Sequence, residues 1–368
     1  MMARFVRDSD ERCTANQRII PKISLLFQAY DSTDILACLR ATTISPLRDV
    51  RMNPFEQSLG ALRAFLGRSI LGKDEAIELT ITCLAAQGHL LIEDVPGVGK
   101  TTLALALARS IDGTFQRIQF TSDLLPSDIL GVQVFNSESR NFEFKQGPIF
   151  ANIILADEIN RTTPKSQSAL LEAMQDGKVT IERSTYELPK PFMVLATQNP
   201  IEFHGTYPLP ESQLDRFLMR ITMGYPAQDQ ELKILKTKEY VARPQTEKPV
   251  CHSKKIVELQ QAVSEIRVDP AIAQYILTII NRTREHKDVE LGISPRGSLA
   301  LYRACQARAI VLNRMHVVPD DVKTLIVPVL AHRLVISGRR TGTPTSHDLR
   351  STAELILQEI TDSVEVPV

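Results

Sequence analysis

The stretch Asp94–Thr102 constrains the fold more than any other part of the chain. It reads Asp-Val-Pro-Gly-Val-Gly-Lys-Thr-Thr, follows the apolar run Leu90–Ile92 and precedes a helix-forming segment rich in Ala and Leu, Leu103–Ile111. A strand, a glycine-containing turn and a helix in this order form a loop that binds phosphate. Gly97 and Gly99 allow the tight turn that directs backbone N–H groups inward, and the helix adds the positive end of its dipole.

Two side chains of this loop have specific predicted roles. Lys100 would reach the β- and γ-phosphates of a nucleoside triphosphate, and the Thr101 hydroxyl would hold Mg²⁺. The strict form of the motif has Gly where this chain has Asp94, and a plain Gly-rich turn before a core helix is the alternative. The sequence therefore predicts nucleotide binding by Pro96, Gly97, Val98, Gly99, Lys100, Thr101 and Thr102.

A second apolar run, Ile153–Ala156, ends in the acids Asp157 and Glu158. This pattern indicates a buried parallel strand whose carboxyl end reaches the site. Asp157 would complete the Mg²⁺ shell through water, and Glu158 would orient and deprotonate the attacking water. Without the phosphate loop, an acidic loop at a strand end would explain the pair equally well.

Three further polar residues are candidates for the same site. Asn199 follows the apolar strand Phe192–Gln198, where it would bind the γ-phosphate or the attacking water, or only shape the turn before Pro200. Arg216 lies in a short predicted helix, Glu211–Phe217, and would either supply charge to a γ-phosphate or form a structural salt bridge. Arg296 lies at the start of a predicted helix, where a cation opposes the helix dipole, and this favours a partner such as phosphate.

Composition narrows the class of protein. The chain has 43 basic and 43 acidic residues, no Trp and 5% aromatic residues, which disfavours binding to nucleic acid or to a membrane surface. Its five cysteines have no paired spacing and are predicted to be reduced thiols of a cytoplasmic protein. No apolar run approaches the roughly 18 residues of a membrane span.

The chain divides into three predicted regions. Residues 1–52 mix charges of both signs and are expected to form a poorly ordered extension, with Met52 as a possible natural start. Residues 53–225 alternate strands and helices, which predicts an α/β core with a parallel sheet flanked by helices. Two β-hairpins, Val132–Lys145 and Val179–Leu188, interrupt this core. Residues 226–368 are predicted to form helices and a C-terminal tail.

These motifs, in this order, resemble the AAA+ ATPases and most closely the MoxR family. The resemblance extends over about Phe55–Leu334. An Asp-Glu-Ile-Asn-Arg run and a Thr-Tyr-Pro-Leu-Pro-Glu loop are specific to the family. The motifs that carry the resemblance are Leu91–Thr101, Leu155–Arg161, Ala196–Glu202, Gly205–Glu211, Gln213–Phe217 and Gly292–Arg296.

The resemblance implies an AAA+ P-loop NTPase core with β-hairpin inserts, a C-terminal all-α lid, and ATP and Mg²⁺ as cofactors. It implies that Lys100 and Thr101 are the Walker A pair, Asp157 and Glu158 the Walker B pair, Asn199 sensor 1 and Arg296 sensor 2. Arg216 matches the arginine finger that reaches the neighbouring subunit's nucleotide. Gly72, with Ile70 and Leu71, falls where such proteins line the adenine pocket, and Arg161 also matches a residue that faces a neighbour.

Family members form ring hexamers and act as chaperone-like motors that mature or activate partner proteins, often ones with von Willebrand factor A domains or metal cofactors. The two hairpins would face the central pore of such a ring. One departure, Asn313-Arg314 in place of the family's Gly-Arg, puts the packing of the lid in question.

The sequence therefore predicts Mg²⁺-dependent ATP hydrolysis by a ring-forming, cytoplasmic motor that acts on a partner protein. A DNA-remodelling motor is one alternative, against which the zero net charge weighs. A nucleotide-binding switch or scaffold with negligible turnover is another, against which the presence of Glu158, Asn199 and Arg216 weighs.

Overall fold

The computed structural model describes residues 53–181, 184–199, 207–236, 248–337 and 346–367. The chain falls into two units, Met1–Arg51 and Met52–Val368, and the account below concerns the second. The predicted N-terminal extension and the loop 200–206 lie outside the described residues. None of the helices in the described ranges is long and apolar enough to span a membrane.

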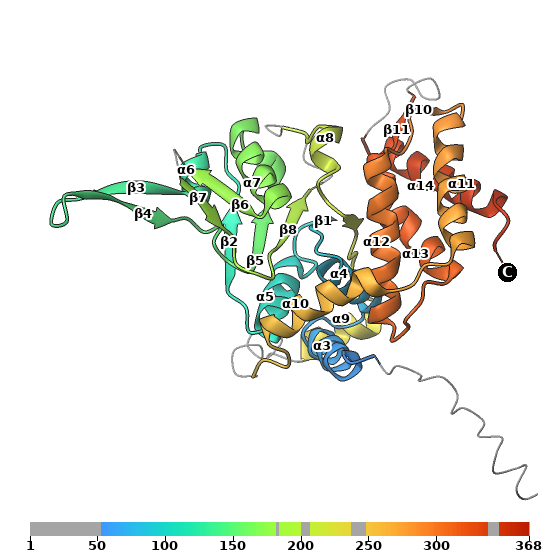
Figure 1. The fold of residues 1–368 in the computed structure, drawn as a ribbon, viewed down its shortest axis with the longest axis horizontal. Helices are drawn as coiled ribbons and strands as arrows, with labels where there is room; N and C mark the ends of the chain where they lie inside the picture. Colours follow the sequence, from blue (N-terminus) through green and yellow to red (C-terminus); the bar gives the residue numbers. More distant parts are fainter. Residues whose placement is uncertain (1–52, 182–183, 200–206, 237–247, 338–345, 368) are drawn as a thin grey trace, which may run out of the picture. The chain divides into compact units, whose positions relative to one another are not determined.

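A five-stranded parallel sheet forms the centre of the core, in the order β2-β5-β8-β1-β9 (Figure 1). The strands β1, β5 and β8 are interior and have neighbours on both sides, so their side chains are buried on both faces of the sheet. This burial explains their continuous apolar sequences and confirms the predicted parallel sheet. The strand bounds are β1 Leu90–Glu93, β2 Phe115–Gln119, β5 Ile153–Asp157, β8 Met193–Gln198 and β9 Met219–Ile221.

Alternate side chains of each strand point to opposite faces of the sheet and enter two separate apolar clusters. Leu90 and Ile92 of β1 pack on one face with the helices α3 (Glu56–Ser69), α4 (Asp74–Ala85) and α5 (Lys100–Ser110). Leu91 packs on the other face, which α6 (Pro126–Leu130) and α7 (Pro164–Asp176) cover. The layered arrangement of helix, sheet and helix holds the carboxyl ends of the strands at one edge.

Two antiparallel hairpins interrupt the core, as predicted. They are β3 (Gly131–Asn136) with β4 (Asn141–Gln146), and β6 (Lys178–Ile181) with β7 (Ser184–Glu187). The β3–β4 hairpin extends away from the sheet (Figure 1) and exposes the aromatic pair Phe135 and Phe142, whose ring centroids lie 5.3 Å apart. At its root, a Cβ on Gly131 would lie 2.3 Å from the carbonyl oxygen of Lys145, so only glycine fits there.

The C-terminal part of the unit is helical. Proline occupies the first turn of three of its helices, where the missing N–H would have no intrahelical acceptor. A short antiparallel pair, β10 (Val289–Leu291) with β11 (Val335–Ile336), is an addition that the sequence analysis did not predict. The helices are α9 Gln228–Lys236, α10 Ser253–Ala262, η3 Val263–Glu265, α11 Pro270–Glu285, α12 Pro295–Val311, α13 Pro319–Leu330, η4 Ala331–Arg333 and α14 Ser346–Ser363.

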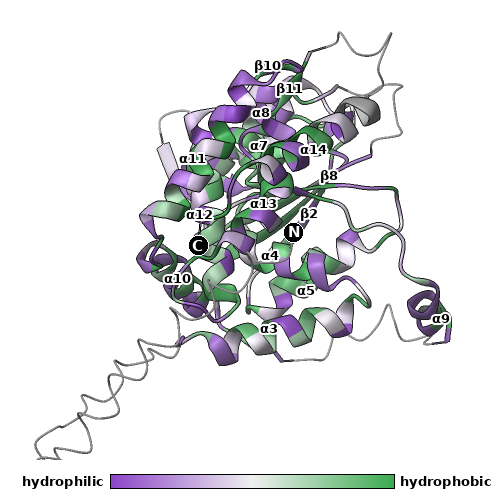
Figure 2. Ribbon diagram, turned by 90° about the vertical axis from the view of Figure 1, so that its right-hand side faces the viewer, coloured by the Kyte–Doolittle hydropathy of each residue, from purple (hydrophilic) through white to green (hydrophobic). Residues whose placement is uncertain are grey.

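Hydrophobic residues concentrate where the helices meet the sheet, as the colouring of α4 and β8 illustrates (Figure 2). Helix α9 differs, because it lies at the margin in this view and exposes Leu232 and Leu235.

Two predicted elements are shorter than expected. Helix α8 covers Glu211–Leu214 and not Glu211–Phe217, because Arg216 and Phe217 close a tight turn with N–H bonds to Gln213 and Leu214. The sequence also predicts a strand over Leu218–Met223, but β9 ends at Ile221 because the side chain of Asp94 binds the N–H groups of Met223 and Gly224.

The departure at Asn313-Arg314 does not disturb the packing of the lid. Asn313 adopts the left-handed conformation with φ of 59°, which Asn tolerates better than most residues other than Gly. Its side-chain oxygen accepts a hydrogen bond from Asn53 Nδ2 at 3.1 Å. Arg314 forms an ion pair with Asp321 at 2.6 Å.

Candidate active site

A cavity of about 370 Å³ lies at the carboxyl edge of the sheet, over the loop between β1 and α5. Gly97 and Gly99 have φ of 87° and 98°, which L side chains rarely adopt, and Gly99 caps the first turn of α5. Val98 packs into the apolar core below the loop. The residues that line the cavity are Pro96, Gly97, Gly99, Lys100, Thr101, Thr102, Arg117, Gln119, Asp157, Glu158, Thr197 and Asn199.

Lys100 lies at the floor of this cavity. Its Nζ donates to the carbonyl oxygens of Asp94 at 2.7 Å and Val95 at 3.1 Å, so the side chain curls back over its own loop. Burial lowers the pKa of Lys100 below its ordinary value, and the charges of Asp94, Asp157 and Glu158 act in the opposite direction. A phosphate bound above the loop would give this ammonium group a negatively charged partner in place of the two neutral carbonyl groups.

Asp94, which replaces the first Gly of the strict motif, has a structural role at the base of the loop. The side chain is buried and its Oδ2 accepts hydrogen bonds from the N–H groups of Met223 at 2.6 Å and Gly224 at 2.5 Å. Its Oδ1 accepts from the N–H of Val95 at 2.9 Å. These bonds attach the loop to the segment that follows β9.

Asp157 is held on both sides of its carboxylate. Oδ1 accepts a hydrogen bond from the Thr197 hydroxyl at 2.6 Å, and Oδ2 receives Nη2 of Arg117 at 2.5 Å and its Nε at 3.2 Å. Arg117 comes from the neighbouring strand β2. The guanidinium of Arg117 therefore pairs with the carboxylate that the sequence predicts to hold Mg²⁺.

Glu158 adopts the left-handed conformation, with φ of 59°, which is uncommon for residues with a side chain and clusters at functional sites. Its N–H donates to the Thr197 hydroxyl at 2.9 Å. Its Oε2 accepts from Gln119 Nε2 at 3.1 Å and pairs with Arg161 at 3.1 Å. The turn therefore directs this carboxylate into the cavity, with Oε2 engaged by both partners.

Asn199 also lines the cavity and is 8% exposed. It follows β8, which lies between β5 and β1 in the sheet, so it stands between the acidic strand end and the loop. The structure thus brings Asn199 together with Lys100, Thr101, Asp157 and Glu158.

Arg216 and Arg296 are not among the residues that line this cavity. They lie instead at a junction between the core and the helical part of the chain. Arg296 Nε is 3.6 Å from Oδ2 of Asp215, the residue before Arg216, and its side chain is 53% exposed. Arg296 therefore contacts the residue next to Arg216, and neither arginine lines the cavity of the phosphate loop.

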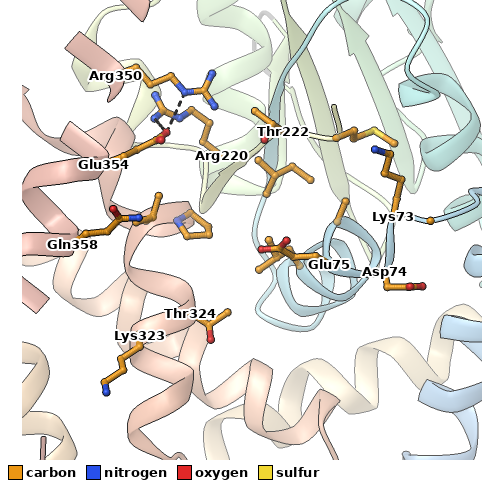
Figure 3. Close-up of a pocket in the computed structure, with 17 residues that line it drawn as sticks. Lys73, Asp74, Glu75, Arg220, Thr222, Lys323, Thr324, Arg350, Glu354 and Gln358 are labelled. Carbon is orange, nitrogen blue, oxygen red and sulfur yellow. Dashed lines mark hydrogen bonds and ion pairs between the residues drawn. The ribbon is translucent and has the colours of Figure 1, made fainter. Parts of the chain in front are cut away.

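Gly72 lines a second cavity, of about 630 Å³, between α4, β9, α13 and α14 (Figure 3). It has φ of 70°, and a Cβ there would lie 2.8 Å from Gln230 of α9. Arg220 and Arg350 in this cavity both pair with Glu354, at 3.3 and 3.2 Å (Figure 3). Met223 lies at its wall, and the N–H of this residue donates to Asp94 at the base of the phosphate loop.

The residues present fit a magnesium ion. Thr101 offers a hydroxyl and Asp157 a carboxylate in the same cavity, and oxygen ligands of this kind are the ones that Mg²⁺ prefers. The pairing of Asp157 with the guanidinium of Arg117 shows that this carboxylate accepts a cationic partner.

Several residues at these sites could not be identified from the sequence. Arg117 and Gln119 occupy alternate positions of one strand, so they project from the same side, but the sequence does not say that this strand pairs with the strand of Asp157. Thr197 looked like part of an apolar strand. Asp215 was noted only as part of a motif, and Arg333, which binds it, carried no signal at all.

The comparisons with known proteins agree with this geometry. Residues 89–219 match the model of the ATPase family associated with various cellular activities (AAA), and residues 281–359 match the AAA lid domain. The chain is 48% identical over 310 residues to uncharacterized protein YeaC of Bacillus subtilis, an alignment that covers 84% of this chain and 95% of that protein.

One further relative carries the name of one branch of this group, and a solved structure shares the fold. The chain is 39% identical over 309 residues to Chaperone MoxR1 of Mycobacterium tuberculosis, covering 82% of this chain and 80% of that protein. A solved structure of a Cytophaga hutchinsonii protein, assigned as an ATPase, matches with a TM-score of 0.75 and 33% identity, covering 85% of this chain and 96% of that one. The phosphate loop, the paired acids, the sheet order and these relatives together establish that the chain belongs to the MoxR family of AAA+ ATPases.

Proposed function

We propose that the chain hydrolyses ATP with Mg²⁺ and works as a ring-forming, chaperone-like motor on a partner protein. The observation that carries the proposal is the cavity that gathers Lys100, Thr101, Asp157, Glu158 and Asn199 around the glycine loop. A binding loop alone would support nucleotide binding only. A carboxylate directed into the same cavity supports hydrolysis.

In the proposed reaction, the loop N–H groups and Lys100 hold the phosphates, and Asn199 orients the attacking water. Glu158 accepts a proton from that water. Its contacts with Gln119 and Arg161 use Oε2, so Oε1 is the oxygen that these contacts leave for the proton. Magnesium, held by Thr101 and through water by Asp157, would neutralise the developing charge on the phosphates.

We further propose that the active site is shared between copies of the chain, in a hexameric ring. Arg216 and Arg296 lie away from the chain's own phosphate loop, at one junction, which supports a role for both at the nucleotide of a neighbouring copy. An arginine supplied by a neighbour can raise the rate by about 10³–10⁵. Activity should therefore rise with protein concentration until the assembly is complete.

Three variants test this proposal. Lys100→Ala should abolish binding of a fluorescent ATP analogue, whereas Glu158→Gln should bind it normally and release no phosphate. Arg216→Ala should also bind and hydrolyse poorly. Wild-type turnover by Glu158→Gln would exclude this residue as the base. Negligible turnover by the wild-type protein at all concentrations would favour a nucleotide-binding switch.

We propose that the partner is a protein to be matured or activated, and that a protein with a von Willebrand factor A domain takes part, in the cytoplasm. The M. tuberculosis relative is named a chaperone, which supports a protein partner. The free thiols of Cys83, Cys251 and Cys305 support a reducing compartment such as the cytoplasm. Capture on immobilised Glu158→Gln protein with ATP, compared with Lys100→Ala as control, would identify the partner. Binding that is equal in both would count against a nucleotide-controlled motor.

A further inference from the structure

The residues on both sides of Arg216 are bound by one buried side chain from the other part of the chain. Arg333 lies in η4, directly after α13, and its side chain is 4% exposed. Its Nε donates to Oδ1 of Asp215 at 2.7 Å, and its Nη2 donates to the carbonyl oxygens of Asp215 at 3.2 Å and Phe217 at 2.7 Å. Its Nη1 donates to the carbonyl oxygens of Leu218 at 3.2 Å and Val329.

Two more side chains from the same part of the chain reach this segment. His332 Nε2 lies 3.0 Å from the carbonyl oxygen of Phe217, and since a carbonyl only accepts, this nitrogen carries the proton. Arg296 approaches the second oxygen of Asp215. The contacts of Arg333, His332 and Arg296 fix the main chain before and after Arg216 without using the guanidinium of Arg216.

Arg333 is suited to a rigid connection. Its guanidinium is planar and presents its donors in a fixed fork, and here all three nitrogens are used. A buried guanidinium is costly unless it is paired, so the arrangement is stable only when Asp215–Leu218 and η4 keep their relative position. The segment that carries Arg216 therefore moves with the end of α13.

We infer that Arg333 is a positioning residue that ties the helical lid to the segment carrying Arg216, so that a displacement of one copy's lid changes how Arg216 meets the nucleotide of the next copy. This inference rests on the proposed shared site. It assigns Arg333 no contact with nucleotide. Its effect would appear as lost turnover in a neighbouring site while the variant's own site still binds nucleotide.

The test uses mixed assemblies of full-length chains. Arg333→Met should bind fluorescent ADP within about two-fold of wild type and hydrolyse ATP about 10–100-fold more slowly, the range that a misplaced catalytic group produces. Glu158→Gln cannot hydrolyse ATP but keeps Arg333 and Arg216 intact. Mixing the slow Arg333→Met variant with the inactive Glu158→Gln variant should restore part of the activity, because Glu158→Gln copies supply a correctly held Arg216 to the sites of Arg333→Met copies.

A matched control is Arg303→Met. Arg303 lies on α12 and also joins the two parts of the chain, through a bond of 2.6 Å to Gln87, but it does not contact the segment of Arg216. It should keep near wild-type turnover. Arg333→Lys retains the charge but not the fork, so its turnover should fall between that of Arg333→Met and wild type.

The outcomes separate the two ideas. If Arg216→Ala is rescued by Glu158→Gln but folded Arg333→Met is not, or if Arg333→Met keeps turnover within two-fold of wild type, the inference about Arg333 is wrong. If Arg216→Ala is not rescued either, the shared site is wrong and the inference falls with it. Should Arg333→Met fail to fold, Asp215→Asn weakens the same connection from the other side, and loss of turnover with rescue is again the supporting result.

Discussion

Asp94 should stabilise the protein by several kilocalories per mole, although the strict loop motif has Gly at this position. Removing the carboxylate by Asp94→Ala leaves three backbone N–H groups, those of Val95, Met223 and Gly224, without their acceptor. The N–H of Met223 is buried, so losing its bond to a charged acceptor costs about 1.5–3 kcal/mol. The other two groups are half-buried and recover part of their bonding from water, adding about 1 kcal/mol together.

We therefore expect Asp94→Ala to lower the free energy of unfolding by about 2.5–4 kcal/mol, measured by urea denaturation followed by circular dichroism without nucleotide. Asp94→Asn keeps one acceptor oxygen and should lose about half as much. Glu172→Ala, an exposed helical carboxylate, is the control and should change stability by less than about 0.5 kcal/mol. The reasoning would be refuted if the free energy of unfolding of Asp94→Ala lay within 1 kcal/mol of wild type. It would also be refuted if Asp94→Ala and Asp94→Asn lowered this free energy equally.

Two more predictions concern the metal and the pH. Arg117→Met should lower the Mn²⁺ concentration that half-fills the site in the presence of ADP, because the guanidinium no longer competes for Asp157. Electron paramagnetic resonance would measure this concentration, and an unchanged value would contradict the prediction. The value for Arg117→Lys should lie between those of Arg117→Met and wild type. Burial lowers the pKa of His89 from 6.5 to about 4, so between these pH values the unfolded chain binds a proton that the folded one does not. The stability contributed by neutral His89 is complete above pH 6.5 and falls by about 3 kcal/mol as the pH is lowered to 4. In His89→Gln, the urea concentration at the midpoint of unfolding should therefore change less with pH over this range than in wild type.

Much of the fold could be predicted because local patterns determine it. The interior strands are apolar throughout because both faces of the sheet are covered, and glycine and proline mark the loop and the helix starts. The acids Asp157 and Glu158 could be assigned to the cavity because parallel strands end at one edge. These inferences need only the order of residues along the chain.

The remaining features depend on contacts between distant residues. Arg117 reaches Asp157 from an adjacent strand, 40 positions away, and no local pattern reveals which strands pair. Arg333 and Asp215 are 118 positions apart, and an arginine after an apolar helix reads as an ordinary solvated residue. The length of α8 was overestimated because Arg216 and Phe217 close a tight turn in place of a further helical turn. The length of β9 was overestimated because the distant side chain of Asp94 binds the N–H of Met223.

The β3–β4 hairpin is held at its root and exposed towards its tip. The aromatic pair Phe135 and Phe142 lies four residues from the root of the hairpin, so at about 3.3 Å per residue it stands roughly 13 Å from the root. At the root, Gly131 and Gly147 pack so closely against neighbouring backbone atoms that this end of the hairpin is held in place. A rotation of only about 10° at the root would carry Phe135 and Phe142 through about 2.3 Å, given the same length. A change too small to alter the fold near the sheet would thus move the exposed aromatic pair by about two-thirds of the length of one extended residue.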